Sequence, residues 1–491
     1  MTDKGPLSLH STFQKKLEAL EPRRRVGFLT PGEFDAAGAD SIIVWLAAQS
    51  PPETLLADSA RTVLVCLVNG AYDTFDSIPR TYAQMGRGYA CAMAVARLRE
   101  ATKLRNGLER RIKVLRHAGP GQAHEAAATA ALMIHQWLVR FARSADDLAA
   151  GLPSMPPAHT GRANGTWHLA MRLALAARAF LGRLCYGIFF AQRWRIGHLE
   201  DPSIEGLTGR LGEITWWPEL ARGEFLADPF IESQDPPVIL CEWKRPQKGR
   251  GVIARVRYQR EQRSLDIVEI LDGAYAHLSY PNFVEYDGAK FLFPECAQSG
   301  RLTKYRLDES GVPRLPGELL FDQPLIDATL LKHDGRWWLF GTMPGAAQSE
   351  SHLYLFHSLD LDGSWTPHPL NPVVIDPACA RPAGRIMVKD GRLIRPAQDC
   401  ERRYGNGLAF MEITLLTTDR YEEQLLTRLV PPARGFPRHG IHTFNIVESP
   451  AGSMAILDGY TVQFDPLAWF DRLMERPRFR KALGKGSSGH P

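Results

Sequence analysis

The sequence predicts an all-β, five-bladed propeller in the C-terminal half of the chain, preceded by a small α/β domain and a helical linker. Two observations lead to this prediction: one hairpin pattern recurs five times, and its period is about 50 residues, which suits a four-stranded blade with its loops. Each copy has a polar or small residue, an apolar run, a turn and a second apolar or aromatic run. The copies begin at Phe225, His277, Leu325, Ala380 and His439.

The turns support hairpins. Three of them carry Asp-Gly, at residues 287–288, 334–335 and 390–391, where Gly takes a positive φ at low cost and Asp tolerates it. A β-sandwich is the alternative fold, but sandwiches do not repeat one motif five times.

The whole chain of 491 residues is too long for one hydrophobic core, so several domains are expected. We predict a small α/β domain over residues 1–100, a helical linker region over 101–210, the propeller over 211–465, and a short helix with a basic tail over 466–491. The first of these rests on the apolar runs SIIVWLAA from Ser41 and TVLVCLVNG from Thr62.

A basic amphipathic helix is predicted over residues 167–194. Its basic residues fall within one arc, opposite Leu169, Leu173, Phe180 and Leu184; they are His168, Arg172, Arg178, Arg183 and Arg193. Such a helix can lie on an anionic membrane surface, or it can pack its apolar face on a domain. The arginines interrupt any run long enough to span a bilayer.

Composition excludes several classes. Hydrophobic residues make up 44% and charged residues 23%, as in folded soluble domains, and the net charge of +5 is too small to indicate nucleic-acid binding. Seven scattered cysteines without a CxxC pair favour reduced thiols over a disulfide framework or zinc site. No nucleotide motif or signal peptide is found, so we expect no cofactor, no metal, and a cytoplasmic protein, peripheral at most to the inner face of the membrane.

The propeller geometry predicts the site. Inner strands line the central channel, so the residues that begin each hairpin should meet there: Asp228, His277, Tyr280, Asp327, Arg381 and His442. Residues that end hairpin strands should form the rim: Glu242, Glu295, Arg395, Gln398 and Asp399. Carboxylates such as Asp228, Asp327 and Glu295 suit acid–base chemistry at a sugar. Alternatively, Asp228 caps a turn before Pro229, and Asp327 bonds to neighbouring backbone amides.

Several motifs carry a family resemblance. They are ADPF at 227–230, HLSYP at 277–281, PE at 294–295, DATL at 327–330, HSLDLDGSWTPHPLNPV at 357–373, ARPAG at 380–384, and RPAQD at 395–399 with YG at 404–405. In this order they resemble the N-terminal propeller of plant glucosamine inositolphosphorylceramide transferases and related bacterial proteins, itself similar to the propellers of glycoside hydrolase family forty-three.

The resemblance implies roles for single residues. In the hydrolases an Asp base in blade one, a pKa-tuning Asp in blade three and a Glu acid in blade four act together; Asp228 and Asp327 match the first two. Blade four has Arg381 instead, which leaves Glu295 as the substitute acid. The predicted substrate-binding set, which draws on the propeller geometry and the shared motifs, is His277, Tyr280, Arg381, Arg395, Gln398, Asp399, Tyr404 and His442, of which Arg381, Arg395 and His277 suit an anionic group.

The N-terminal region faintly resembles a formyltransferase domain. Asn69 and Asp73 or Asp76 are present, but the family's His is missing from the stretch after the strand, so the resemblance implies a degenerate, non-catalytic domain.

The resulting prediction is a carbohydrate-related protein whose propeller binds or processes a glycan or glycolipid headgroup in cell-envelope or exopolysaccharide biosynthesis. Two alternatives stay open. One is a non-catalytic carbohydrate-binding or scaffold module that works beside a partner glycosyltransferase. The other is a formyl- or acyl-transferring enzyme that acts through the N-terminal domain. Whether the chain is an enzyme is left open.

Overall fold

The computed structural model describes two compact units, Met1–Ala179 and Phe180–Pro491. In the first unit it describes four strands and Leu132; in the second it describes residues 181–182 and 184–474, apart from 235–236, 247, 275, 346–347, 402 and 450–451. The predicted helix before residue 181, the formyltransferase-like residues Asn69, Asp73 and Asp76, and the tail from residue 475 lie outside the described residues.

The strands of the first unit form one mixed sheet in the order β1-β2-β3-β4. The first pair is parallel and the other two are antiparallel. The bounds are Ile42–Trp45, Thr62–Val68, Cys91–Arg97 and Leu108–Ile112. The last strand lies beyond the predicted boundary at residue 100, where we expected a helix. Backbone pairing with β3 overrides the local helical preference.

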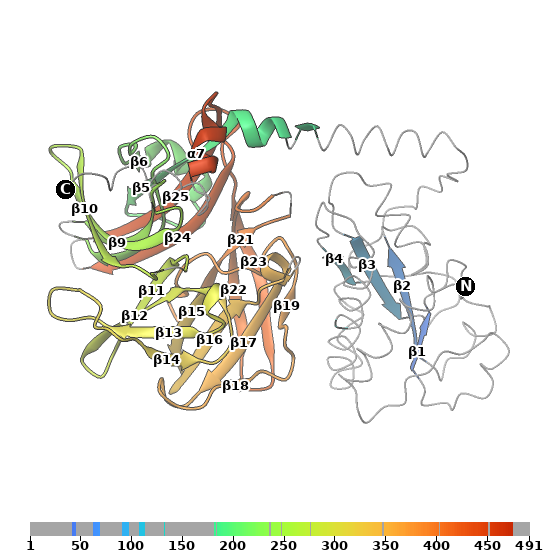
Figure 1. Cartoon of the computed structure of the whole chain (residues 1–491). Coiled ribbons are helices and arrows are strands. Elements are labelled where there is room, and N and C mark those ends of the chain that lie inside the picture. The colour runs from blue at the N-terminus through green and yellow to red at the C-terminus, as the bar shows by residue number, and fades with distance from the viewer. Residues whose placement is uncertain are drawn as a thin grey trace, which may run out of the picture. The chain divides into compact units, whose positions relative to one another are not determined.

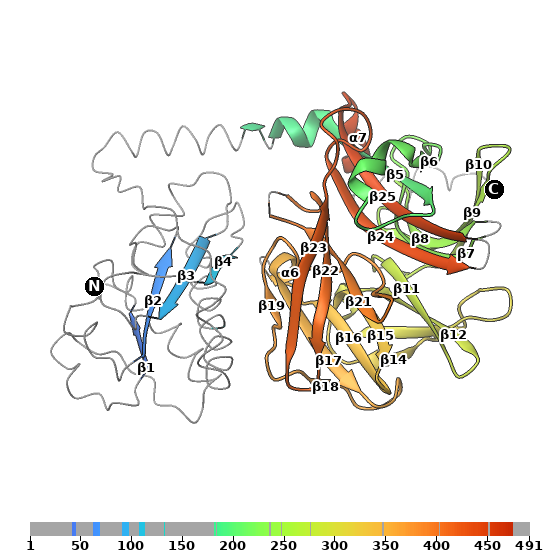
Figure 2. The same cartoon turned by 180° about the vertical axis from the view of Figure 1, so that it is seen from behind.

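The second unit confirms the predicted propeller: five antiparallel sheets follow one another along the chain (Figures 1 and 2). Blade one is β7–β10, with bounds Phe225–Ser233, Val238–Lys244, Gly251–Gln259 and Ser264–Leu271. Blade two is β11–β14, with bounds Ser279–Tyr286, Ala289–Glu295, Leu302–Arg306 and Glu318–Phe321.

Blade three is β15–β19, with bounds Ile326–His333, Arg336–Thr342, His352–Ser358, Thr366–Pro367 and Val374–Ile375. Blade four is β20–β23, with bounds Met387–Lys389, Arg392–Asp399, Gly407–Leu416 and Tyr421–Leu429. Short helices connect or follow these sheets: η4 Leu207–Glu213, η5 Ala297–Ser299, α6 Gln348–Ser351 and α7 Ala468–Met474.

Blade five closes the ring with strands from both ends of the unit. Its order is β24-β25-β5-β6, with bounds Gly440–Ser449, Gly452–Phe464, Phe190–Glu200 and Thr215–Trp216. The propeller therefore begins at Phe190 rather than at residue 211, and the helical residues before it end at Phe189 rather than near Trp194. Pairing satisfies the exposed edge of β25, and this outweighs helical periodicity in the same segment.

The innermost strands share an irregularity. Their pairing with the second strand shifts between Ala227 and Phe230, and at the equivalent places in blades two, three and five. At this point Asp228, Tyr280 and Asp327 adopt left-handed φ values of 53°, 44° and 51°. A bulge redirects side chains locally, so the shift brings polar residues of different blades to one level.

Apolar side chains fill the space between the blades. The largest buried ones include Trp217, Phe230, Phe293, Phe340 and Phe410. Trp337 and Trp338 are each 3% exposed and belong to this packing. The polar residues of the inner strands are therefore an exception within an otherwise apolar interior.

Candidate functional site

One half of the central site is an ion-pair cluster between blades five and one. His442 Nδ1 lies 3.1 Å from Asp228 Oδ1 and 3.3 Å from Asp458 Oδ2. Thr443 donates its hydroxyl to Asp228 at 2.8 Å, and the Tyr280 amide donates to the other Asp228 oxygen at 3.1 Å. All the acceptor positions of Asp228 thus face donors of neighbouring blades.

Asp458 ties the same strands together through the backbone. Its carboxylate accepts the Asp228 amide at 2.8 Å and the Thr443 amide at 2.7 Å. The side chain is completely buried, so these bonds have no competition from water.

The charges in this cluster support each other. Burial opposes ionisation of His442, but Tyr404, Asp228 and Asp458 raise its pKa well above the ordinary value. Burial likewise favours the neutral form of Asp228, yet His442 and the hydrogen bonds from Thr443 and Tyr280 lower its pKa. The cluster therefore holds an imidazolium and a carboxylate at neutral pH.

The other half of the site joins blades two, three and four. Asp327 Oδ2 accepts from Arg381 Nε at 2.6 Å and from Gln398 Nε2 at 2.9 Å. The Asp327 amide donates to Glu295 Oε2 at 3.2 Å. Burial and the Asp327 charge raise the pKa of Glu295 well above its ordinary value, so this carboxyl carries a proton that it can donate.

Tyr404 connects the two halves. Its hydroxyl contacts His442 Nε2 and accepts from Arg381 Nη2 at 3.4 Å, and the Arg381 guanidinium lies 4.9 Å from the centre of its ring. Desolvation raises the pKa of the phenol, which keeps its proton. Since Arg381 and the charged His442 are donors, the hydroxyl proton is left to point at a ligand oxygen, and 38% of Tyr404 is exposed.

His277 and Glu242 form part of the rim. His277 accepts the Gly251 amide on Nδ1 at 2.9 Å, so its proton sits on Nε2, 3.5 Å from Glu242 Oε1. Burial lowers the pKa of His277, and burial with the Asp228 charge raises the pKa of Glu242 to about 8. Both groups are therefore neutral near pH 7, with the His277 side chain 38% exposed.

Tyr280 lies deeper than predicted for a substrate-binding residue. It is completely buried, its hydroxyl contacts Thr329 at 2.9 Å, and it accepts the Gly384 amide at 2.7 Å. Its ring packs edge-on against Phe230. Tyr280 therefore crosses the channel and supports the inner strands.

Two predicted residues lie apart from this network. Arg395 is 0% exposed and forms a bidentate pair with Glu423 at 2.7 and 3.0 Å. Asp399 lies 3.3 Å from Arg428. Alternation along β21 explains this, because Arg395 and Asp399 share one face of the strand while Gln398 points to the other face, toward Asp327.

One group of side chains has the donor set for a cation. Asp228, His442 and Asp458 offer ligand atoms that lie within 4.8 Å of one another. A cation there would compete with the proton on His442 Nδ1, which already serves both carboxylates. The hydrogen bonds of this cluster fit an ion-pair network.

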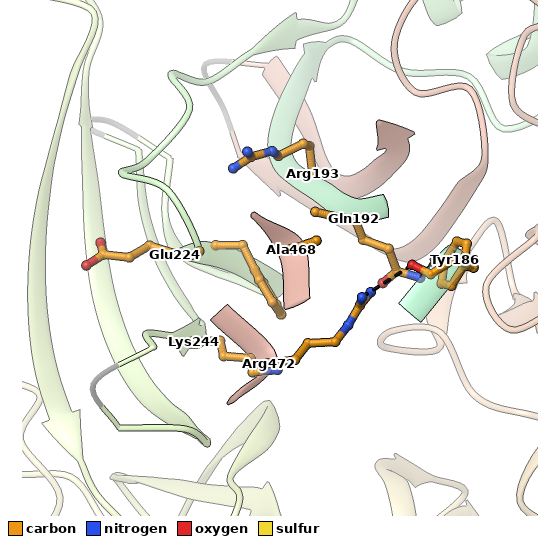
Figure 3. A pocket seen from close by; sticks show the side chains of 10 residues that line it. Tyr186, Gln192, Arg193, Glu224, Lys244, Ala468 and Arg472 are labelled. Atoms are coloured by element: carbon orange, nitrogen blue, oxygen red, sulfur yellow. Dashed lines mark hydrogen bonds between the residues drawn. The ribbon is translucent and has the colours of Figure 1, made fainter. Parts of the chain in front are cut away.

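A pocket of about 280 Å³ opens beside the network, between blade one and the helical ends of the propeller (Figure 3). Its wall includes Phe225, Lys244, Arg193 and Arg472. Phe225 stacks on Trp194 at 6.0 Å, and Trp194 packs edge-on against His442 at 5.4 Å. The pocket thus combines cations with an aromatic wall one ring away from the ion pairs.

Sequence reasoning missed several of these residues. Asp458 lies in the second strand of the fifth hairpin, as Glu242 and Glu295 lie in the second strands of theirs, and this place in the repeat was the available signal. Trp194 was missed because it was assigned to a helix.

The fold and site define a five-bladed propeller with a polar, ion-paired centre. Residues 219–436 match the family model described as "Glucosamine inositolphosphorylceramide transferase 1, N-terminal". Most of the propeller thus matches this domain, and the predicted resemblance of the propeller to it is confirmed.

Curated plant proteins also match part of the chain. Glucosamine inositolphosphorylceramide transferase 1 of Oryza sativa subsp. japonica is 29% identical over 248 residues, which are 48% of this chain and 33% of the relative. The protein of that name from Arabidopsis thaliana is 31% identical over 205 residues, 40% of this chain and 27% of the relative. The chain thus spans about a third or less of the length of these relatives.

Solved propellers also match. Zg3597, a family 117 glycoside hydrolase of Zobellia galactanivorans, gives a TM-score of 0.33 at 10% identity, over 56% of this chain and 91% of that one. A sucrose-6-phosphate hydrolase from Lactobacillus gasseri gives 0.35 at 14% identity, over 49% and 58%. A thermostable family-43 glycoside hydrolase gives 0.33 at 12% identity, over 43% and 77%.

Proposed function

We propose that the centre of the propeller binds the sugar-containing headgroup of a glycolipid during the assembly of cell-envelope glycans. The observation that carries this proposal is the bridge formed by Tyr404, a partly exposed phenol held by Arg381 on one side and His442 on the other. The plant relatives support the choice of ligand, since their name refers to glucosamine and inositolphosphorylceramide.

Side chains of the rim provide hydrogen-bond donors and acceptors for the hydroxyl groups of a sugar. Tyr404 donates to a ligand oxygen, and the neutral carboxyl groups of Glu242 and Glu295 can both donate and accept. Lys244 in the adjoining pocket suits a phosphate of the headgroup.

The test is calorimetric titration of the full chain with inositol phosphate, glucosamine and neutral hexoses. Tyr404→Phe removes only the bridging hydroxyl, and we expect it to weaken binding of the best ligand about tenfold, the effect of losing one well-placed hydrogen bond. Tyr286→Phe is the matched control, because that hydroxyl, at the exposed end of β11, bonds to Asp360 in the loop after β17 and takes no part in the contacts of Tyr404. Equal affinity in the wild type and Tyr404→Phe would refute the role given to Tyr404.

A second candidate function is glycosyl hydrolysis or transfer at the same site. The observation in its favour is the protonated Glu295 beside Asp327, an acid next to a carboxylate held by Arg381. Against it, Asp228 and Asp327 are already engaged by protein donors. Product analysis of each bound ligand decides: turnover that disappears in Glu295→Gln establishes an enzyme, and binding without turnover establishes a binding module.

A further inference from the structure

Large apolar side chains gather on one surface of the second unit, where the helical residues before β5 meet α7. We call it the aromatic patch. It consists of Leu184, Phe189, Phe464, Leu467, Trp469 and Phe470, whose exposed fractions run from 40% to 67%. Single exposed apolar residues are ordinary, but a contiguous group of this kind marks a contact surface.

The patch is built from two segments held firmly together. Phe189 and Phe464 stack at 6.2 Å, and the Asp465 amide donates to the Phe189 carbonyl at 2.7 Å. Arg472 of α7 donates to the carbonyls of Phe190, at 2.7 Å, and of Gly187. Both views of the propeller show this helical segment beside α7 (Figures 1 and 2). The exposed side chains are therefore fixed by the fold of the propeller.

Positive charge flanks the patch along the chain on both sides. Before it, residues 167–183 contain Arg172, Arg178 and Arg183 and no acidic residue. After it, residues 475–491 contain one acidic residue, Glu475, and five basic ones: Arg476, Arg478, Arg480, Lys481 and Lys485. Exposed aromatic and leucine side chains with basic stretches adjoining them in the sequence suit an anionic bilayer, whose interface favours Trp and Phe and attracts Lys and Arg.

The patch also adjoins the pocket. Tyr186, Ala468 and Arg472 line the pocket and belong to the same two segments that carry the patch. A surface bound there would lie beside the opening next to His442 and Trp194.

We propose that the aromatic patch docks the protein on the surface of an anionic lipid bilayer. Docking brings the pocket close to the lipid headgroups at that surface. This consequence rests on the proposed function, that the propeller binds a headgroup. None of the helices in the described part of the chain has the length and hydrophobicity to cross a bilayer.

The experiment is co-sedimentation of the full chain with vesicles of phosphatidylcholine containing phosphatidylglycerol, and with vesicles of phosphatidylcholine alone. The test variant is Leu467→Glu with Trp469→Glu, which places charge in the patch at exposed positions. The matched control is Val268→Glu with Leu359→Glu, two exposed apolar residues on blades one and three that are 60% and 74% accessible. Thermal melting verifies that both variants are folded.

We expect the wild type and the control to sediment with the anionic vesicles, and the patch variant to partition about tenfold less. Binding should also fall as salt is raised. Wild type that stays in solution, or equal partitioning of the patch variant and the control, would overturn the proposal. If light scattering shows that the wild type is a dimer and the patch variant a monomer, the patch is the contact surface for a second copy of the chain. That result would also overturn the proposal.

Binding of soluble inositol phosphate separates this inference from the proposed function. If the patch variant loses vesicle binding and keeps inositol phosphate binding, the docking surface is established independently. If the wild type binds inositol phosphate but no vesicles, docking alone is refuted.

Discussion

At the level of single residues, the site separates its acidic groups by environment. Asp228 has a cationic neighbour and stays ionised, whereas burial beside other carboxylates keeps Glu242 and Glu295 protonated. Carboxyl groups whose pKa values are pushed apart in this way offer hydrogen-bond acceptors and donors at one place. A site of this kind suits sugar hydroxyls, which both donate and accept hydrogen bonds.

Glu242 predicts a pH dependence of stability. Its pKa is about 8 in the folded protein against 4.5 ordinarily, so folding binds a proton between these values and stability is lost as pH rises through this window. The loss amounts to at most about 5 kcal/mol. Urea unfolding near pH 5 and near pH 8 should show a smaller difference in Glu242→Gln than in the wild type. An unchanged difference would contradict the protonated state of Glu242.

Asp458 predicts a structural cost. Asp458→Ala leaves the buried amides of Asp228 and Thr443 without an acceptor and removes one partner of His442, so we expect a loss of about 3 kcal/mol or more in unfolding free energy. Urea denaturation measures it. The exposed Asp360→Ala is the control and should lose much less. Comparable losses in both variants would show that the Asp458 bonds contribute little.

At the level of elements, the site depends on how the innermost strands approach one another. Gly384 lies in the segment that leads into β20, with φ of 142°, and a Cβ there would stand 1.9 Å from the Phe444 carbonyl oxygen. The neighbouring atom is backbone and cannot turn away. Only glycine allows blade four to reach blade five at this level.

Gly384→Ala should therefore destabilise the propeller by about 3 kcal/mol or more through overpacking and backbone strain. Thermal unfolding of the variant checks this. Gly391→Ala is the matched control, because that glycine also has a positive φ but no atom within reach of a Cβ. If both substitutions cost the same, the close approach of the strands is unimportant.

Arg395, in β21, and Arg381, in the segment before β20, predict different phenotypes. Arg395→Ala leaves the buried Glu423 carboxylate without its cationic partner and should lower the unfolding free energy by about 3–5 kcal/mol. The protein that remains folded should keep its affinity for the ligand. Arg381→Ala should weaken headgroup binding, since it releases Tyr404. Unfolding curves and ligand titrations of both variants distinguish the two roles. If folded Arg395→Ala loses affinity for the ligand, Arg395 is a substrate-binding residue after all.

At the level of the whole molecule, the propeller is closed by a strand from before the repeats. β5 pairs with β25 from Phe190–Phe464 through Glu200–Met454. Without β5 the outer edge of β25 would be unpaired, so this pairing completes blade five and closes the ring of blades.

Truncation tests this closure. A fragment of residues 181–474 retains β5 and should melt cooperatively, whereas a fragment of residues 203–474 lacks it and should be strongly destabilised or aggregate. Circular dichroism melting and light scattering compare the two. Equal melting temperatures would mean that β5 is dispensable.

The repeat made most of the fold predictable, because a hairpin is a local pattern and propeller geometry then places Asp228, Asp327, Arg381 and His442 around one centre. β5 was unpredictable from local pattern, since its partner lies far along the chain and its residues also fit a helix. Arg395 and Asp399 were placed in the site without regard to alternation along β21. The bridge through Tyr404 depends on side-chain positions that no spacing reveals.

The most direct test of the account is titration calorimetry of inositol phosphate and glucosamine into the full chain and its Tyr404→Phe variant, with Tyr286→Phe as control. We expect binding to the wild type and control, and about tenfold weaker binding to Tyr404→Phe in protein that melting curves show to be folded. Absence of binding to every sugar and sugar phosphate, or full affinity in Tyr404→Phe, would contradict a headgroup site centred on the bridge between Arg381 and His442.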